Sequence, residues 1–162
     1  MVAGLVEREC PALVTVVSVA VEVDAPPEAV WAVVSNPRNL PHWDRHIVAV
    51  EGLPEDGLGP RVAYITVMRF MAMRARVRAE VLEWSPPARS RIRLSGLLDA
   101  TVDTKVSPLP GGRSRLEHHV DYRFKGGALG ELAARSLRLV GGSRLALRHG
   151  IMAQKREIES RR

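Results

Sequence analysis

The sequence contains little cysteine and few aromatic residues. Cys10 is the only cysteine. No internal disulfide can form, and nothing in the cysteine usage points to an oxidising compartment. Aromatic residues make up 4% of the chain, so the apolar volume of a core must come from valine, leucine, alanine and methionine. With 162 residues, the chain has the length of one ordinary domain and can bury a substantial core.

Long apolar runs are also missing. The longest extends from Leu13 to Val23 and is interrupted by Thr15, Ser18 and Glu22, so it is too short and too polar to cross a bilayer. The N-terminus shows no basic region followed by an apolar stretch and a small-residue cleavage site, so no signal peptide is expected. We therefore predict a cytoplasmic protein without an integral membrane segment.

The motifs of nucleophilic, nucleotide and metal chemistry are absent. There is no Gly-x-Ser-x-Gly sequence, and no glycine-rich segment has the spacing of a phosphate-binding loop. His42, Asp44 and His46 form a His-x-Asp-x-His cluster, but alternate residues at a helix end seldom converge on one metal ion. The sequence predicts no metal site and no cofactor.

The formal net charge is +6, and most of the basic residues are arginines. Six of them alternate along two neighbouring segments: Arg74, Arg76, Arg78, Arg89, Arg91 and Arg93. We interpret them as a solvated sheet face with cross-strand partners such as Glu80, Glu117 and Asp121. The alternative is a basic interaction module for nucleic acid or a membrane surface. Because aromatic residues do not interleave these arginines, nucleic acid is not expected as a partner.

A two-residue alternation of apolar and polar side chains dominates the middle of the chain. A β-branched segment at 13–23 is followed by strand-like segments at 47–53, 62–68, 73–84, 89–94, 98–106 and 116–124. This alternation is typical of an antiparallel sheet with one face in water. The other face then needs a cover.

Helical signals surround these strands. Asp24 to Glu28 has the prolines and the acid of a helix start, and Asn36 can cap a second short helix that ends near Trp43. A long apolar stripe at helical spacing runs over 128–159, and Gly141-Gly142 predicts a kink or break within it. We expect a leader over residues 1–12 and a single domain over residues 13–162.

Several of these segments resemble a known family. The segment from Val19 to Trp31, which contains Asp24-Ala25-Pro26-Pro27-Glu28, is similar to the opening of the START/Bet v 1-like (SRPBCC) superfamily. The segment from Val34 to Asp44 matches the second-helix signature of its bacterial polyketide cyclase/dehydrase and lipid transport branch. The resemblance implies an α+β helix-grip fold, in which a curved antiparallel sheet wraps around a long C-terminal helix and two short helices follow the first strand. It also implies a deep pocket for a hydrophobic ligand.

The predicted inner face of the sheet carries several polar side chains, which would cost about 1–3 kcal/mol each if buried without a partner. His118, Tyr64 and Tyr122 are the candidates for acid/base catalysis. The alternative is that His118 is a satisfied core histidine and the tyrosines only line the wall. The other predicted ligand-binding residues are Thr66, Met68, Met73, Thr104, Trp31, Val140 and Leu147.

Three functional hypotheses follow. The first is an enzyme that holds a flexible polyketide-like chain for cyclisation or dehydration, with proximity supplying much of the rate. The second is a non-catalytic carrier or sensor of a lipid-like molecule. The third is the basic interaction module on the arginine-rich face. In the first two, the partner is a small hydrophobic ligand held between the sheet and the C-terminal helix.

Overall fold

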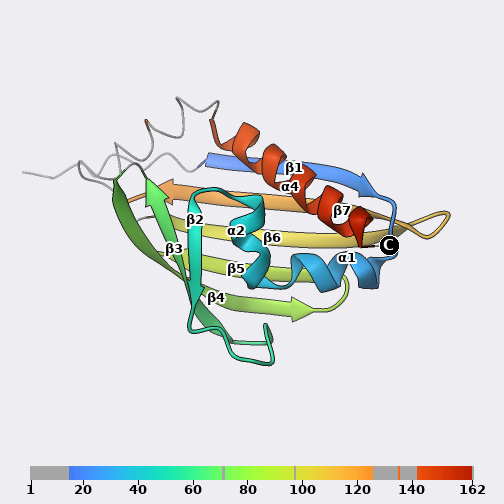
Figure 1. The fold of residues 1–162 in the computed structure, drawn as a ribbon, viewed down its shortest axis with the longest axis horizontal. Coiled ribbons are helices and arrows are strands. Elements are labelled where there is room, and N and C mark those ends of the chain that lie inside the picture. The colour runs from blue at the N-terminus through green and yellow to red at the C-terminus, as the bar shows by residue number, and fades with distance from the viewer. Residues whose placement is uncertain (1–14, 71, 97, 126–134, 136–141, 162) are drawn as a thin grey trace, which may run out of the picture.

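The computed structural model describes residues 15–70, 72–96, 98–125, 135 and 142–161. Its seven strands form one antiparallel sheet in the order β1-β7-β6-β5-β4-β3-β2 (Figure 1). The strands are β1 (Thr15–Val23), β2 (Ile47–Glu51), β3 (Ala63–Phe70), β4 (Met73–Ser85), β5 (Arg89–Ser95), β6 (Leu98–Leu109) and β7 (Arg113–Phe124). The helical elements are α1 (Pro27–Val34), the 3-10 turn η1 (Pro37–Asn39), α2 (Leu40–Trp43) and α4 (Gly142–Ser160). This architecture confirms the predicted α+β helix-grip class.

The two short helical segments begin at the predicted prolines. Pro27 is the first residue of α1, where a missing N–H removes no intrahelical hydrogen bond, and Glu28 places an acid in the first turn. The side chain of Asn36 accepts a hydrogen bond of 3.1 Å from the backbone N–H of Arg38 and so caps η1. These local signals explain why the chain turns back over the sheet after β1.

Helix α4 begins at Gly142, which has a φ of 80°. A residue with a side chain is strained in this left-handed conformation, whereas glycine is not. The helix therefore begins at the glycine pair where the sequence predicts an interruption. The predicted helical stretch before Gly142 lies outside the described residues, apart from Arg135.

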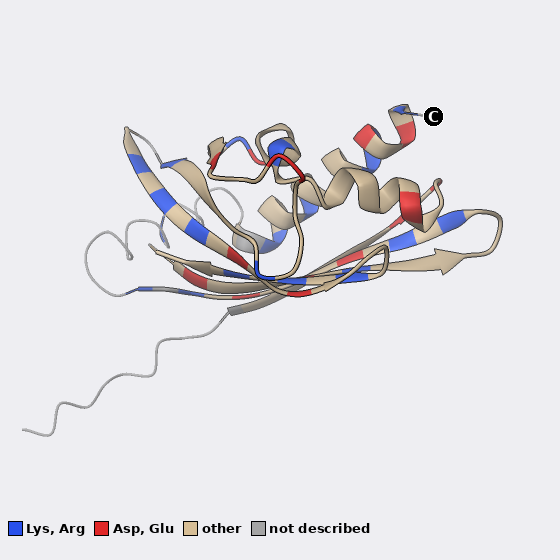
Figure 2. Ribbon diagram, turned by 90° about the horizontal axis from the view of Figure 1, so that it is seen from below, with Lys and Arg blue, Asp and Glu red and all other residues tan. Residues whose placement is uncertain are grey.

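All described helices lie on one face of the sheet (Figure 2). Polar contacts fasten the C-terminal half of α4. The Trp43 Nε1–H donates to Glu157 Oε2 at 2.6 Å, and Lys155 Nζ donates to the carbonyl oxygen of Glu22 at 2.6 Å. The apolar core beneath consists of Val23, Ala25, Val30, Trp31, Val33, Trp43, Val106, Leu116, Ile151 and Ile158. None of the described helices is long and apolar enough to cross a membrane.

The two faces of β4 follow the predicted alternation. Val77, Ala79 and Val81 are buried toward the helices, whereas Arg76 is exposed on the other face. Arg76 pairs with Val67 of β3 and also forms an ion pair with Glu51 of β2. Because β3 lies between β4 and β2, the side chain of Arg76 crosses β3 beside Val67, and Val67 is buried despite its outward position.

Candidate ligand site

A row of buried polar side chains crosses the inner face of the sheet, which is the face under the helices. Ser90 of β5 lies opposite Thr104 of β6, and Thr104 lies opposite His118 of β7. All three are buried, and α4 adds the buried Gln154 to the same cluster. These four neighbouring polar groups form the central polar cluster of the candidate site.

Both ring nitrogens of His118 have a hydrogen-bond partner. Nε2 lies 2.7 Å from Gln154 Oε1, and Nδ1 lies 3.0 Å from Thr104 Oγ1. An amide oxygen can only accept, so Nε2 carries the hydrogen and donates it to Gln154. Nδ1 then has a free lone pair and accepts the hydrogen of the Thr104 hydroxyl.

The imidazole of His118 is neutral at physiological pH. Burial lowers the pKa of His118, because the charged form would lose its hydration, and the hydrogen bond to Gln154 offsets only part of this effect. A neutral imidazole with both nitrogens engaged is the arrangement of a satisfied core histidine. Nδ1 nevertheless remains an unprotonated base in contact with a hydroxyl group.

Tyr64 lies on the same inner face, toward the β2 edge of the sheet. Its side chain is buried, with 5% of the residue exposed, and desolvation raises the pKa of Tyr64 to about 12. Its hydroxyl forms no hydrogen bond with any other described residue, and the hydroxyl oxygen is not fully enclosed by protein atoms. Nearby Thr66 is different, because its Oγ1 donates to the carbonyl oxygen of Val77 at 3.2 Å.

The three predicted catalytic residues share a face without forming one cluster. Tyr64 on β3 and His118 on β7 are four strands apart in the sheet, which corresponds to about 19 Å along a flat sheet. Tyr122, which is half-buried, is four residues from His118 on β7, a separation of about 13 Å. No single proton-transfer centre contains all three, but an elongated molecule could contact each of them.

Trp31 and Met73 are two of the predicted ligand-binding residues. Trp31 is buried in the core and packs against Trp84, with ring centroids 5.2 Å apart and planes inclined at 58°. Met73 lies at the first position of β4, opposite Phe70, and 49% of it is exposed. The inward alternation of β4 therefore does not bury its first residue, because this end of the strand extends beyond the described helices.

The remaining predicted lining residues are distributed as follows. Met68 on β3 and Leu147 on α4 are half-buried, Thr104 belongs to the polar row, and Val140 lies outside the described residues. Sequence reasoning missed Ser90 and Gln154. Both had a usable signal: Ser90 is two residues before the inward Ile92, and Gln154 interrupts the apolar stripe between Ile151 and Ile158.

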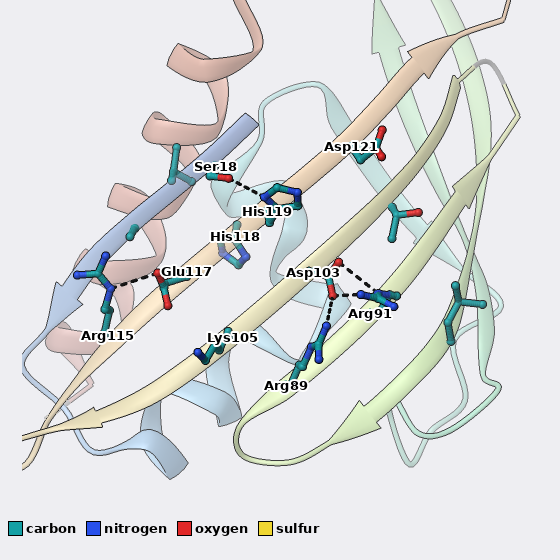
Figure 3. A pocket seen from close by; sticks show the side chains of 14 residues that line it. Ser18, Arg89, Arg91, Asp103, Lys105, Arg115, Glu117, His118, His119 and Asp121 are labelled. Atoms are coloured by element: carbon teal, nitrogen blue, oxygen red, sulfur yellow. Dashed lines mark hydrogen bonds and ion pairs between the residues drawn. The ribbon is translucent and has the colours of Figure 1, made fainter. Parts of the chain in front are cut away.

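The opposite, outer face of the sheet holds a groove of about 1020 Å³ over β1, β7, β6 and β5 (Figure 3). Its charges are largely paired: Arg89 and Arg91 contact Asp103 at 3.1 and 3.0 Å, and Arg115 contacts Glu117 at 3.2 Å. The predicted solvated face is present here, although Asp103 takes the place expected for Glu80 and Asp121.

The His-x-Asp-x-His cluster forms local contacts. His46 Nδ1 lies 2.9 Å from Asp44 Oδ1, and His42 Nδ1 lies 4.0 Å from Glu157 Oε2. Within the described part of the chain, no group of three or more histidine, cysteine or acidic residues is placed to hold a metal ion.

A curved antiparallel sheet that grips a C-terminal helix defines the START/Bet v 1 class of helix-grip proteins. Residues 14–147 match the model of the family described as polyketide cyclase / dehydrase and lipid transport. The chain belongs to this family, as the sequence resemblance predicts. No curated protein matches the sequence.

Solved structures show the same fold at low sequence identity. The chain is similar to the Zhui aromatase/cyclase from Streptomyces sp., with a TM-score of 0.74 and 16% identity over 92% of this chain and 96% of that one. A protein from Thermus thermophilus gives a TM-score of 0.70 and 17% identity, over 90% and 98%. A START superfamily protein from Mycobacterium smegmatis gives 0.67 and 17%, over 91% and 99%.

Proposed function

We propose that this protein binds a small apolar molecule, polyketide-like or lipid-like, between the inner face of the sheet and α4. The observation that carries the proposal is Tyr64, which is 5% exposed and whose hydroxyl forms no hydrogen bond with any other described residue. The hydroxyl oxygen is not fully enclosed, so it is available to a bound molecule beside an apolar wall. A ligand oxygen would accept its hydrogen, and the family to which the chain belongs is described by polyketide and lipid chemistry.

The inner face is suited to a mostly apolar ligand that carries a few polar groups. Near Tyr64 on β3 the wall is formed by buried Val77 and Ala79. The polar pair Thr104 and His118 lies three and four strands further along the sheet, on β6 and β7. Apolar pockets with a few convergent polar groups are typical of small-molecule sites. Tyr122, Met68 and Leu147 line the space between in this proposal.

Acid/base catalysis on the bound molecule is a second candidate, favoured by the unprotonated Nδ1 of neutral His118. Thr104 lies beside His118 on the neighbouring strand β6, and its hydroxyl contacts Nδ1. This hydroxyl would take a proton from the ligand while passing its own proton to Nδ1. With a pKa of about 12, Tyr64 is too weak an acid to give up its proton readily at neutral pH. In this scheme it donates a hydrogen bond to a ligand carbonyl.

Calorimetric titration with two probes tests binding: emodin as an aromatic polyketide and palmitate as a lipid. Wild type should bind at least one of them, and Tyr64→Phe should weaken that binding about three- to tenfold, the value of one hydrogen bond. His119→Asn, on the outer face, is the matched control and should bind as wild type does. Failure of both probes to bind or to raise the melting temperature would contradict the proposal.

The catalytic candidate needs a separate experiment with a linear poly-β-keto ester. Wild type should accelerate formation of the cyclised, light-absorbing product, and Thr104→Val should abolish the acceleration while it still binds emodin or palmitate. Equal rates for wild type and Thr104→Val would eliminate catalysis through Thr104 and His118 and leave a carrier or sensor.

A further inference from the structure

The β3–β4 hairpin carries arginines that no described residue neutralises. Arg69 and Arg74 are directly opposite each other in the strand register, and Arg78 follows on the same face of β4. The guanidinium groups of these three residues form no ion pair or hydrogen bond with any other described residue. In Figure 2 the basic residues of the hairpin lie in a row that leads to its tip, at the left end of the molecule.

Elsewhere on the outer face most arginines are paired, and Arg93 of β5 is an exception among the described residues. Besides the contacts to Asp103 and Glu117, Arg113 Nη1 lies 2.9 Å from Glu22 Oε2, and Arg123 Nη2 lies 3.3 Å from Asp99 Oδ2. Like charges placed directly opposite each other destabilise an antiparallel pair. Because no described acid balances Arg69 and Arg74, this arrangement favours an anion as their partner.

The described residues at the tip between these two arginines, Ala72 and Met73, are apolar and exposed. Met73 is 49% exposed, the second most exposed large apolar side chain among the described residues. An apolar tip that is bordered on both sides by arginine matches the two layers of a membrane interface. Apolar side chains enter the acyl boundary, and guanidinium groups bind the phosphates above it.

We propose that the β3–β4 hairpin docks on an anionic phospholipid bilayer. Arg69, Arg74 and Arg78 contact lipid phosphates, and the exposed Ala72 and Met73 enter the interface. Nucleic acid fits less well, because the aliphatic side chains of Met73 and Ala72 gain nothing against a phosphate backbone. The inference is independent of the inner polar row, so it can fail while ligand binding holds, and the reverse is also true.

Vesicle co-sedimentation tests the docking. The probes are vesicles of phosphatidylcholine alone and vesicles of phosphatidylcholine and phosphatidylglycerol in equal parts. Wild type should bind only the anionic vesicles, and added salt should release it. The combined variant Arg69→Gln, Arg74→Gln, Arg78→Gln should lower partitioning roughly a hundredfold, because each arginine near an anionic surface contributes about fivefold.

A matched control removes the same charge from another surface. The control is a combined variant of α4 that replaces three exposed arginines without ion pairs to described residues: Arg144→Gln, Arg148→Gln, Arg156→Gln. It should keep wild-type partitioning. Met73→Ser should weaken partitioning severalfold, whereas Met152→Ser, an exposed methionine on α4, should not. The hairpin variant should melt no lower than wild type, because it removes an opposed like-charge pair.

Four results would overturn the proposal. The first is that wild type does not bind anionic vesicles. The second is that both triple variants lose partitioning to the same extent, so that net charge alone determines binding. The third is that Met73→Ser and Met152→Ser partition equally. The fourth is that double-stranded DNA displaces wild type from the vesicles and binds through the same three arginines, which would assign the hairpin to nucleic acid.

Discussion

His118 and His119 are consecutive residues of β7 in opposite environments. Only 8% of His118 is exposed, and its ring is held between Thr104 and Gln154. His119 is exposed on the outer face, where its Nδ1 lies 2.6 Å from Ser18 Oγ. Because successive side chains of a strand point to opposite faces, the pair compares the two faces at one position. The inner face holds neutral polar groups in fixed contacts, and the outer face holds charges in water.

The largest expected difference is in stability. His118→Leu removes both hydrogen bonds and leaves polar atoms of Thr104 and Gln154 buried without partners, so the free energy of unfolding should fall by about 3 kcal/mol. His119→Leu should change it by no more than about 0.5 kcal/mol. Urea unfolding measures both. Equal losses in the two variants would mean that the inner row is not the fixed structure described.

Gln154→Leu removes a single inner contact and leaves the Nε2–H of His118 unpaired. We expect a loss of about 1–2 kcal/mol in the free energy of unfolding. Arg156→Leu, two residues further along α4 and exposed, serves as the comparison and should lie near wild type. A stable Gln154→Leu variant would indicate that water or a ligand satisfies His118 instead.

Acid should destabilise the protein through His118. The unfolded chain takes up a proton on this residue near its ordinary pKa of 6.5, whereas burial lowers the pKa in the folded protein. The unfolded state then binds more protons, so stability is lost as the pH falls below about 6.5. The melting temperature should decline less steeply from about pH 7 to about pH 5 in His118→Gln than in wild type. A flatter profile in His119→Gln instead would reverse the comparison of the two faces.

The smallest effect on stability is expected for Tyr64→Phe. The lost hydroxyl has no partner among the described residues, so the free energy of unfolding should change by no more than about 0.5 kcal/mol. Its effect should be on ligand affinity. In an alkaline titration followed by phenolate absorbance, the variant should also lack the group that ionises at about pH 12. A large loss of stability would show that Tyr64 is a structural residue.

The sequence was sufficient to predict the fold and much of the face assignment. Alternation along 73–84 and 116–124 correctly buries Val77, Ala79 and His118. Gly141-Gly142 predicts a kink or break in a helix over 128–159, and α4 begins at Gly142. The separation of Tyr64 from His118 could not be predicted, because it depends on strand order, which alternation does not determine. The contact of Gln154 with His118 depends on how α4 is placed over β7.

The exposure of Met73 shows a second limit. The two-residue alternation assigns Met73 to the inner face, but burial also requires a neighbouring layer. The end of the β3–β4 hairpin extends past the described helices. The arginine rows show the same limit on the outer face. Arg89 and Arg91 find Asp103 because β6 lies beside β5, whereas Arg74 faces another arginine across the hairpin.

Native mass spectrometry of the protein purified from its own cells, followed by organic extraction, tests the central claim most directly. The account predicts a mass above that of the chain alone, and release of an apolar polyketide-like or lipid-like molecule on denaturation. Binding of the extracted molecule should weaken in Tyr64→Phe and persist in His119→Asn. A chain that carries no molecule and whose melting temperature is unchanged by emodin, palmitate and other hydrophobic compounds would contradict the account.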